Sequence, residues 1–223
     1  MTSSRRTLTA KVIHHPLPSN YQKLLQDAEK EELYVGNFPY RKIVGSLMYS
    51  MLGTRPDLAC ALSVVSQFLD KHKPTHVKLV QRILQYVRAN LELKLVYGLP
   101  DKSFTLTGYC DASYSNETNY YSRSGYGFLL GGSLISWYSK KQLVPAQSAA
   151  EAEYYAASAA SNEAIWLQKL LKELGFNQKT ITLYEDNQTC IALTKNPEDH
   201  KRTKHIQVKY HVIRYYVDQG FVS

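Results

Sequence analysis

The sequence has few cysteines and no long apolar run. Its three cysteines, Cys60, Cys110 and Cys190, are far apart and form no C-x-x-C pair, so we interpret them as reduced core residues of an intracellular protein. No apolar run approaches the roughly 20 residues of a membrane span, and the first residues lack the apolar core of a signal peptide. We therefore expect a cytoplasmic or nuclear protein that is neither secreted nor held in a membrane.

Zinc motifs, repeats and low-complexity tracts are also missing. The seven histidines have no matching set of cysteines at the spacing of a zinc site. No segment is repeated along the chain, and no tract has a strongly biased composition. These absences argue against a zinc module and against a repeat protein.

What is present is a basic chain of ordinary globular composition. Among 223 residues, 27 Lys and Arg against 19 Asp and Glu give a formal net charge of +8, and 44% of the residues are hydrophobic. This length is enough for one or two domains with a substantial core. The excess of positive charge suits a polyanionic partner but does not identify one.

The first part of the sequence is helical in character. Residues 1–35 are polar and predict a loosely held arm with a short helix near 20–31. Residues 36–92 contain three runs with helical apolar spacing, "YRKIVGSLMYSMLG", "TRPDLACALSVVSQFLDK" and "PTHVKLVQRILQYVRAN". Thr54 is placed to cap the second run, and Pro74 to open the third. The segment predicts a small α-helical module.

From residue 93 onward the apolar period becomes two. The runs "KLVYGL", "SFTLTGYCDASY", "SGYGFLLGG" and "SLISWYSKK" predict an antiparallel meander. A long helix over 148–174, closed by Gly175, comes next. It is followed by a buried strand "TITLYED", a helix at 187–194, a final helix "TKHIQVKYHVIRYYVD" and the opening of a strand at "GFVS". Residues 93–223 therefore predict an α/β domain with a mixed sheet.

Two aspartates lie in predicted strands that are otherwise mostly apolar, where an acidic side chain is unusual. Asp111 lies in the otherwise apolar strand "TGYCDASY", and Asp186 ends the strand "ITLYED". In open α/β sheets the carboxyl ends of strands are where sites collect. Asp186 by itself also fits the N-cap of the helix that follows.

The long helix carries two glutamates, Glu151 and Glu153, which cannot share a face because they are two residues apart. Steps of three and four residues from Glu153 follow an apolar stripe of Ala156, Ala157, Ala160, Ala164, Leu167 and Leu171. We therefore expect Glu153 to face the sheet. Glu151 begins a more polar stripe, so we expect it to face solvent, where its charge suits the helix dipole.

These side chains, Asp111, Glu153 and Asp186, could meet at one edge of the sheet. Carboxylates brought together repel one another, so they persist only with a cation between them. Ligands that are all oxygen favour Mg²⁺ or Mn²⁺ over zinc. Two such ions on a carboxylate cluster are the apparatus for hydrolysis of a phosphodiester.

Seven phrases in fixed order carry a family resemblance: "YRKIVGSLMYSMLGTRPDL", "GYCDASY", "SRSGYGFLLGGSLISWYSKKQ", "EAEYYAA", "AIWLQKLL", "LYEDNQTCIALTKNP" and "HKRTKHIQVKYHVIR". From about Tyr40 to the C-terminus the chain resembles the end of a Ty1/copia-type retrotransposon Pol polyprotein. The matching part covers the tail of the reverse transcriptase and most of the ribonuclease H domain.

The resemblance implies a ribonuclease H-like fold, a mixed sheet with helices on both faces. It also implies hydrolysis of the RNA strand of RNA–DNA hybrids with Mg²⁺ or Mn²⁺, and it assigns Asp111, Glu153 and Asp186 as catalytic metal ligands. The remainder of a Pol polyprotein is the other implied partner. Nucleic-acid contacts are expected at Arg123, Ser124, Lys140, Lys141, Asn187 and Gln188. A solvated hairpin turn is the alternative interpretation of the first two of these residues.

Several departures from the family pattern bear on activity. The family's fourth acid belongs to a segment resembling Ala-Asp-Ile-x-Thr-Lys, which this sequence does not contain, so we expect weak turnover and one bound ion in place of two. Gln207 stands where the family has Asp, and Ala149 and Ala150 stand where it has Ser-Thr. The polymerase carboxylates of the family are absent, so we expect no DNA synthesis.

The sequence is also compatible with two other functions. A transposon-derived protein could keep the fold and the basic surface and bind nucleic acid without cleaving it. Alternatively, the helical module and the aromatic strands could form a protein-binding face, since the chain has 18 tyrosines and Tyr is enriched at interfaces. Neither the oligomeric state nor the choice between a domesticated gene and a decayed element follows from the sequence.

Overall fold

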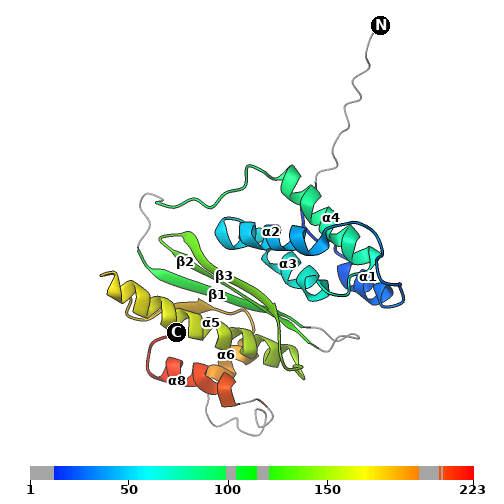
Figure 1. Cartoon of the computed structure of the whole chain (residues 1–223). Helices are drawn as coiled ribbons and strands as arrows, with labels where there is room; N and C mark the ends of the chain where they lie inside the picture. The colour runs from blue at the N-terminus through cyan, green and yellow to red at the C-terminus, as the bar shows by residue number, and fades with distance from the viewer. Residues whose placement is uncertain (1–12, 99–103, 115–120, 196–205, 207) are drawn as a thin grey trace. The chain divides into compact units, whose positions relative to one another are not determined.

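The computed structural model describes residues 13–98, 104–114, 121–195, 206 and 208–223 (Figure 1). The chain divides into two compact units, residues 1–94 and residues 95–223. We call them the helical unit and the α/β unit and describe each by itself. Among the described residues no helix is both long and apolar enough to cross a membrane.

The helical unit has its core between four helices, α1 (Tyr21–Ala28), α2 (Tyr40–Gly53), α3 (Ala59–Val65) and α4 (Pro74–Ala89), with short 3-10 turns at Pro56–Leu58 and Ser66–Phe68. Helix α4 begins at Pro74, as predicted. The capping role predicted for Thr54 is wrong: its backbone amide donates to the carbonyl of Ser50, so Thr54 closes α2, and Arg55 precedes the next turn.

The segment around α1 is bonded to the start of α4. Lys73 Nζ donates to the carbonyls of Ala28 and Glu29 at 2.9 and 2.7 Å. The Glu31 carboxylate accepts from the backbone amide and the hydroxyl of Thr75 at 3.0 and 2.6 Å, and these hydrogen bonds lower the pKa of Glu31. The negative charge of Glu31 therefore lies at the N-terminal end of α4, where the helix dipole favours it.

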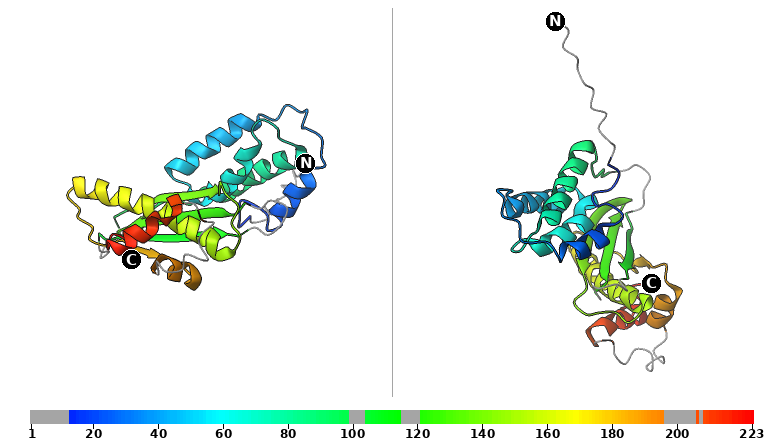
Figure 2. Two further views of the ribbon diagram at one scale, coloured as in Figure 1. Left: turned by 90° about the horizontal axis from the view of Figure 1, so that it is seen from below. Right: turned by 90° about the vertical axis from the view of Figure 1, so that its right-hand side faces the viewer.

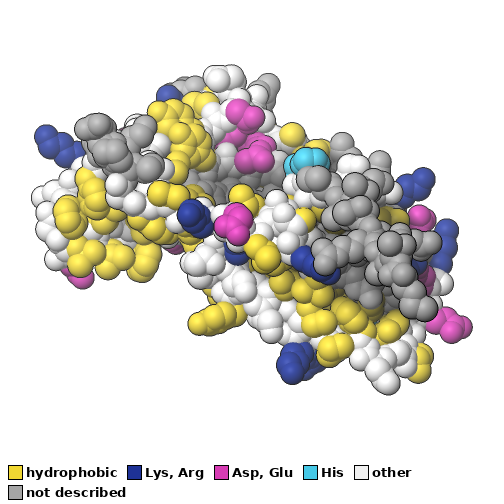
Figure 3. Space-filling model, turned by 90° about the horizontal axis from the view of Figure 1, so that it is seen from above, with side chains coloured by type: hydrophobic (Ala, Val, Ile, Leu, Met, Phe, Trp, Pro, Cys, Tyr) yellow, Lys and Arg dark blue, Asp and Glu magenta, His cyan; other side chains and the backbone are white. Residues whose placement is uncertain are grey.

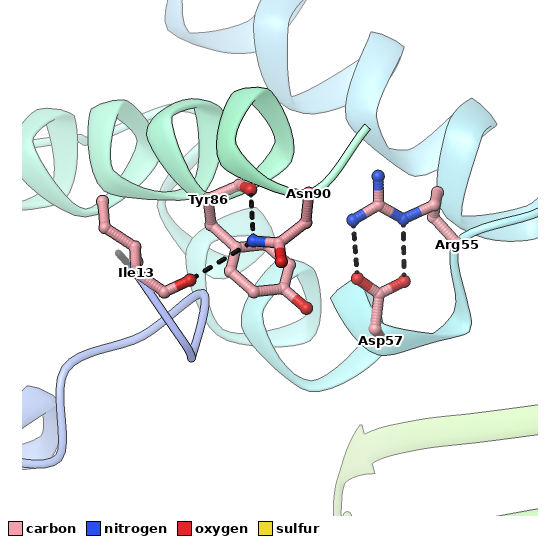
Figure 4. A network of polar contacts seen from close by, with 5 residues as sticks. All are labelled: Ile13, Arg55, Asp57, Tyr86 and Asn90. Carbon is pink, nitrogen blue, oxygen red and sulfur yellow. Dashed lines mark hydrogen bonds and ion pairs between the residues drawn. The ribbon is translucent and has the colours of Figure 1, made fainter. Parts of the chain in front are cut away.

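An ion pair between a buried arginine and a more exposed aspartate lies within this unit (Figure 4). Arg55 donates from Nε and Nη2 to the two carboxylate oxygens of Asp57, at 3.0 and 2.8 Å, and Arg55 is only 7% exposed. Close by, the Asn90 side-chain amide donates to the carbonyls of Tyr86 and Ile13, joining the end of α4 to the N-terminal segment. The guanidinium thus depends on Asp57 for compensation of its charge.

Replacing Asp57 with alanine should lower the free energy of unfolding by about 2 kcal/mol, because it leaves the mostly buried Arg55 guanidinium without its carboxylate partner. Urea unfolding would measure this loss. Asp70→Ala is the matched control, since its ion pair with Arg41 is solvent-exposed on both sides and should contribute little. Equal effects of the two substitutions would contradict the assigned role.

The α/β unit is built on a four-stranded mixed sheet formed by β1 (Leu106–Ser113), β2 (Arg123–Leu130), β3 (Ser133–Lys141) and β4 (Thr182–Tyr184), in the order β3-β2-β1-β4. Strands β1, β2 and β3 pair antiparallel, and β4 pairs parallel to β1. Gly131 and Gly132 connect β2 to β3 with φ angles of 57° and 78°, the left-handed conformation that a two-residue hairpin turn requires. The mixed sheet and the α/β class agree with the prediction.

Two further strand predictions had different outcomes. Residues 94–98 of "KLVYGL" form no strand. Tyr97 contacts β3 through its side chain, since its hydroxyl donates to the carbonyl of Leu134 at 3.0 Å. The strand predicted to open at "GFVS" is confirmed by one residue pair. Ile181 forms a parallel bridge with Val222, supported by backbone hydrogen bonds on both sides.

Helix α5 (Ala149–Glu173) packs on β1, β2 and β4. Its N-cap Ser148 accepts from the amide of Glu151 at 3.2 Å. At its other end Gly175 has a φ of 88°, and the amides of Gly175 and Phe176 bond back to the carbonyls of Lys172 and Leu171. The predicted apolar stripe is confirmed, since its four alanines and two leucines are buried. The small alanine side chains let α5 lie close to the sheet.

The C-terminal elements cover α5 on its far side (Figures 1 and 2). They are α6 (Gln188–Lys195), the 3-10 turn Val208–His211 and α8 (Val212–Asp218), all of which contact α5. Part of the predicted final helix, residues 203–205 and 207, lies outside the described residues. Along β1 buried and exposed residues alternate, because the described helices of this unit cover one face of the sheet and not both faces as expected.

Candidate metal centre

Three carboxylates converge at one end of the sheet. Asp111, Glu153 and Asp186 each place an oxygen so that the three atoms lie within 4.8 Å of one another. Asp111 comes from the central strand β1, Asp186 from the turn after β4, and Glu153 from the first turns of α5. The parallel pairing of β1 with β4, which sets Tyr109 opposite Tyr184, brings the two aspartates side by side.

The three acids differ in exposure. Asp111 and Asp186 are exposed, whereas Glu153 is buried, with 7% of its surface accessible. Glu153 accepts a hydrogen bond from the backbone amide of Ala112, but its Oε2 atom is buried without a hydrogen-bond partner. Burial, and then the charges of Glu185 and Asp111, raise the pKa of Glu153 to about 8. An unpaired buried carboxylate oxygen beside other acids is costly unless a cation compensates it.

The residues at this site fit a hard divalent cation. All three side chains offer carboxylate oxygens, the ligand type that suits Mg²⁺ or Mn²⁺. Glu153 belongs to this cluster, and its Oε2 lacks a hydrogen-bond partner among the described residues. Asp111 and Asp186 leave the outer side of the cluster open to solvent, so a ligand can reach it.

Glu185 is a further acid beside this cluster, and we did not predict it as a site residue from the sequence. Its Oε2 accepts from the Cys110 thiol at 3.2 Å, and its Oε1 accepts from the backbone amide of Asn187 at 3.1 Å. Burial raises the pKa of the Cys110 thiol, which therefore remains a hydrogen-bond donor. Burial also raises the pKa of Glu185, and the neighbouring Asp186 and Asp111 add to this. Its only signal in the sequence was its place directly before Asp186.

The N-cap reading of Asp186 is wrong. The N-cap residue of α6 is Asn187, whose Oδ1 accepts from the backbone amide of Cys190 at 3.0 Å. Asp186 therefore keeps its carboxylate for the cluster. Asn187, one of the expected nucleic-acid contacts, has its side-chain oxygen committed to the cap, while its neighbour Gln188 is exposed.

Glu151 does not face solvent as expected. It is 4% exposed, and its carboxylate accepts from the amide of Gln147 at 2.8 Å and from the hydroxyl of Tyr155. The Tyr155 ring in turn packs on Tyr210, with ring centroids 4.1 Å apart. The prediction failed because the C-terminal elements cover the side of α5 that faces away from the sheet.

The remaining expected nucleic-acid residues lie at the ends of β2 and β3. Arg123 pairs with Lys141, so these two basic side chains lie side by side on one face of the sheet. Lys140 pairs with Ser124 and therefore points to the opposite face. Arg123 also lies opposite Ser113, two residues beyond Asp111 on β1. Lys140 is exposed, and Lys141 lies over the ring of Tyr121 at 4.7 Å.

Ser124 occupies a different environment from its neighbours. It is 5% exposed, and its hydroxyl accepts from Gln142 Nε2 at 2.9 Å. The same nitrogen donates to the carbonyl of Ala152, at the start of α5, also at 2.9 Å. Ser124 thus joins β2 to α5 from the inside and does not present its hydroxyl at the surface.

Positive charge is not concentrated in one place on the face shown in Figure 3. The described Lys and Arg side chains there, in dark blue, lie apart from one another among hydrophobic and uncharged groups. The pairing of Arg123 with Lys141 is therefore more informative about a partner than the net charge of the chain.

Comparison with known proteins places the chain among transposon polyproteins. It is 42% identical over 213 residues to the retrovirus-related Pol polyprotein from transposon TNT 1-94 of Nicotiana tabacum, which covers 94% of this chain and 16% of the polyprotein. It is 39% identical over 185 residues to that from transposon RE1 of Arabidopsis thaliana, covering 81% of this chain and 12% of the polyprotein.

A shorter relative is the secreted RxLR effector protein 161 of Plasmopara viticola, which is 44% identical over 138 residues, 59% of this chain and 92% of that protein. No protein-family model matches the chain. The chain thus spans a small part of the polyproteins that it matches over most of its own length. It belongs to the Pol polyproteins of Ty1/copia-type retrotransposons.

Proposed function

We propose that the α/β unit is a ribonuclease H-like domain that hydrolyses the RNA strand of an RNA–DNA hybrid with divalent cations. The observation that carries the proposal is the convergence of Asp111, Glu153 and Asp186 within 4.8 Å, with a buried and unpaired oxygen on Glu153. The sheet order β3-β2-β1-β4, with β4 parallel to a central β1, supports the ribonuclease H-like fold that the sequence resembles.

The three acids would hold Mg²⁺ or Mn²⁺, which when bound supplies water activation and charge stabilisation for phosphodiester hydrolysis. Glu153 holds the inner side of the centre, because it is buried and fixed by the amide of Ala112. Asp111 and Asp186 are exposed and form the outer side, where a phosphate group of the substrate can approach.

The basic end of the β2–β3 hairpin would hold the nucleic-acid backbone. Arg123 lies on the strand next to Asp111, and Lys141 lies beside Arg123 one strand further out. Side chains of this type bind phosphate oxygens, position the substrate and carry no sequence information. We therefore expect recognition of the hybrid backbone and not of a base sequence.

Incubation of the purified chain with a hybrid labelled on the RNA strand should give cleavage of that strand with Mg²⁺ or Mn²⁺ and none after chelation by EDTA. Single-stranded RNA and duplex DNA of the same sequence are the control substrates. Salt-dependent binding of the hybrid without metal-dependent cleavage would contradict the proposal and support a non-catalytic binding role.

A further inference from the structure

Glu185 follows β4 and joins the segment that carries Asp186 to strand β1, which carries Asp111. Its carboxylate accepts from Cys110, the residue before Asp111, at 3.2 Å. It also accepts from the backbone amide of Asn187, the residue after Asp186, at 3.1 Å. Each of these hydrogen bonds holds a direct chain neighbour of a proposed ligand.

Glu185 lies on the inner side of the cluster. Cys110 is buried and alternates along β1 with the exposed Asp111, so its thiol points to the side of the sheet that α5 covers. Glu153 comes from that same side, and its Oε2 is buried and unpaired. The partly buried carboxylate of Glu185 therefore places negative charge behind the three ligands.

We propose that Glu185 is a positioning residue of the metal centre, which sets the spacing of Asp111 and Asp186 through Cys110 and Asn187. It acts from behind the ligands and strengthens cation binding through its negative charge. Residues that orient metal ligands in this way commonly change metal affinity by ten-fold or more when they are replaced. This inference rests on the metal centre of the proposed function and adds a fourth carboxylate to it.

The test is Mn²⁺ affinity, measured by the electron paramagnetic resonance signal of free Mn²⁺ in a titration of the full chain. Glu185→Gln keeps the size of the side chain and should weaken Mn²⁺ binding by about ten-fold. Thermal unfolding in EDTA should occur at the same temperature as in the wild type or higher, because a repulsive charge has been removed. A structural role alone would give the opposite pattern, a lower unfolding temperature with unchanged affinity, and would overturn the proposal.

Two further variants separate this inference from the metal centre itself. Glu163 lies on α5, as Glu153 does, and accepts from the Ser136 hydroxyl, so Glu163→Gln should leave Mn²⁺ affinity unchanged. Asp186→Asn should abolish measurable binding. Loss of binding in Asp186→Asn with wild-type affinity in Glu185→Gln would overturn the role of Glu185 alone. Absence of Mn²⁺ binding in the wild type would overturn the metal centre, and the role of Glu185 with it.

Discussion

Asp111→Asn should reduce metal-dependent cleavage of the hybrid by more than about 100-fold, since replacement of a residue that only supports a metal ligand already costs 10- to 100-fold. Asp111 lies on the central strand of the sheet and belongs to the 4.8 Å cluster, so the substitution removes a charged ligand with little change of shape. Single-turnover cleavage with excess protein and Mn²⁺ would measure the loss even when turnover is slow.

The matched control is Glu173→Gln, which also removes one carboxylate but at the exposed end of α5. It should leave cleavage unchanged. Loss of cleavage in Asp111→Asn without loss of folded structure, as judged by circular dichroism, would locate the chemistry at the cluster. Equal cleavage by Asp111→Asn and wild type would assign the activity to another site or to a contaminating nuclease.

Glu151→Ala should lower the free energy of unfolding by about 3 kcal/mol, the second large effect that we expect. The substitution removes a buried carboxylate that accepts from the amide of Gln147 and the hydroxyl of Tyr155. Both donors would lose this partner. The hydrogen bond from the Gln147 amide, which joins the segment before α5 to its first turn, would be lost. Urea unfolding in the presence of EDTA would measure the change without any contribution from bound metal.

Glu153→Gln provides the comparison two residues away. Glu153 has repulsive neighbours in Glu185 and Asp111, so its neutralisation should leave the metal-free protein as stable as the wild type or more stable. It should nevertheless abolish Mn²⁺ binding, which Glu151→Ala should preserve in the folded protein. If Glu151→Ala were neutral and Glu153→Gln destabilising in EDTA, the structural assignment of the two glutamates would be wrong.

Local signals predicted much of the α/β unit. The alternating runs around Asp111, the paired glycines at 131 and 132 and the alanine stripe of α5 each specify an element from neighbouring residues. The period of the α5 stripe also assigned Glu153 to the side of the sheet. These features depend on backbone preference and on one buried face, both of which are visible in a short stretch of sequence.

Features that depend on distant packing were not predictable in this way. The burial of Glu151 depends on Tyr155 and Tyr210, which meet only after the C-terminal elements have packed on α5. Glu185 was overlooked because its partner Cys110 is 75 positions away in the chain. The failed strand at 94–98 had suitable residues but no backbone partner, and a pairing partner is a property of the whole sheet.

The central place of β1 has a consequence for the order of folding. Strands β1, β2 and β3 follow one another in sequence, whereas β2, β3 and α5 all lie between β1 and β4 in the chain. Long-range closure of this kind is entropically slow compared with hairpin formation. We therefore expect Asp111 to be in its strand before Asp186 arrives beside it, so that the mutual repulsion of the acids opposes the pairing of β4 with β1.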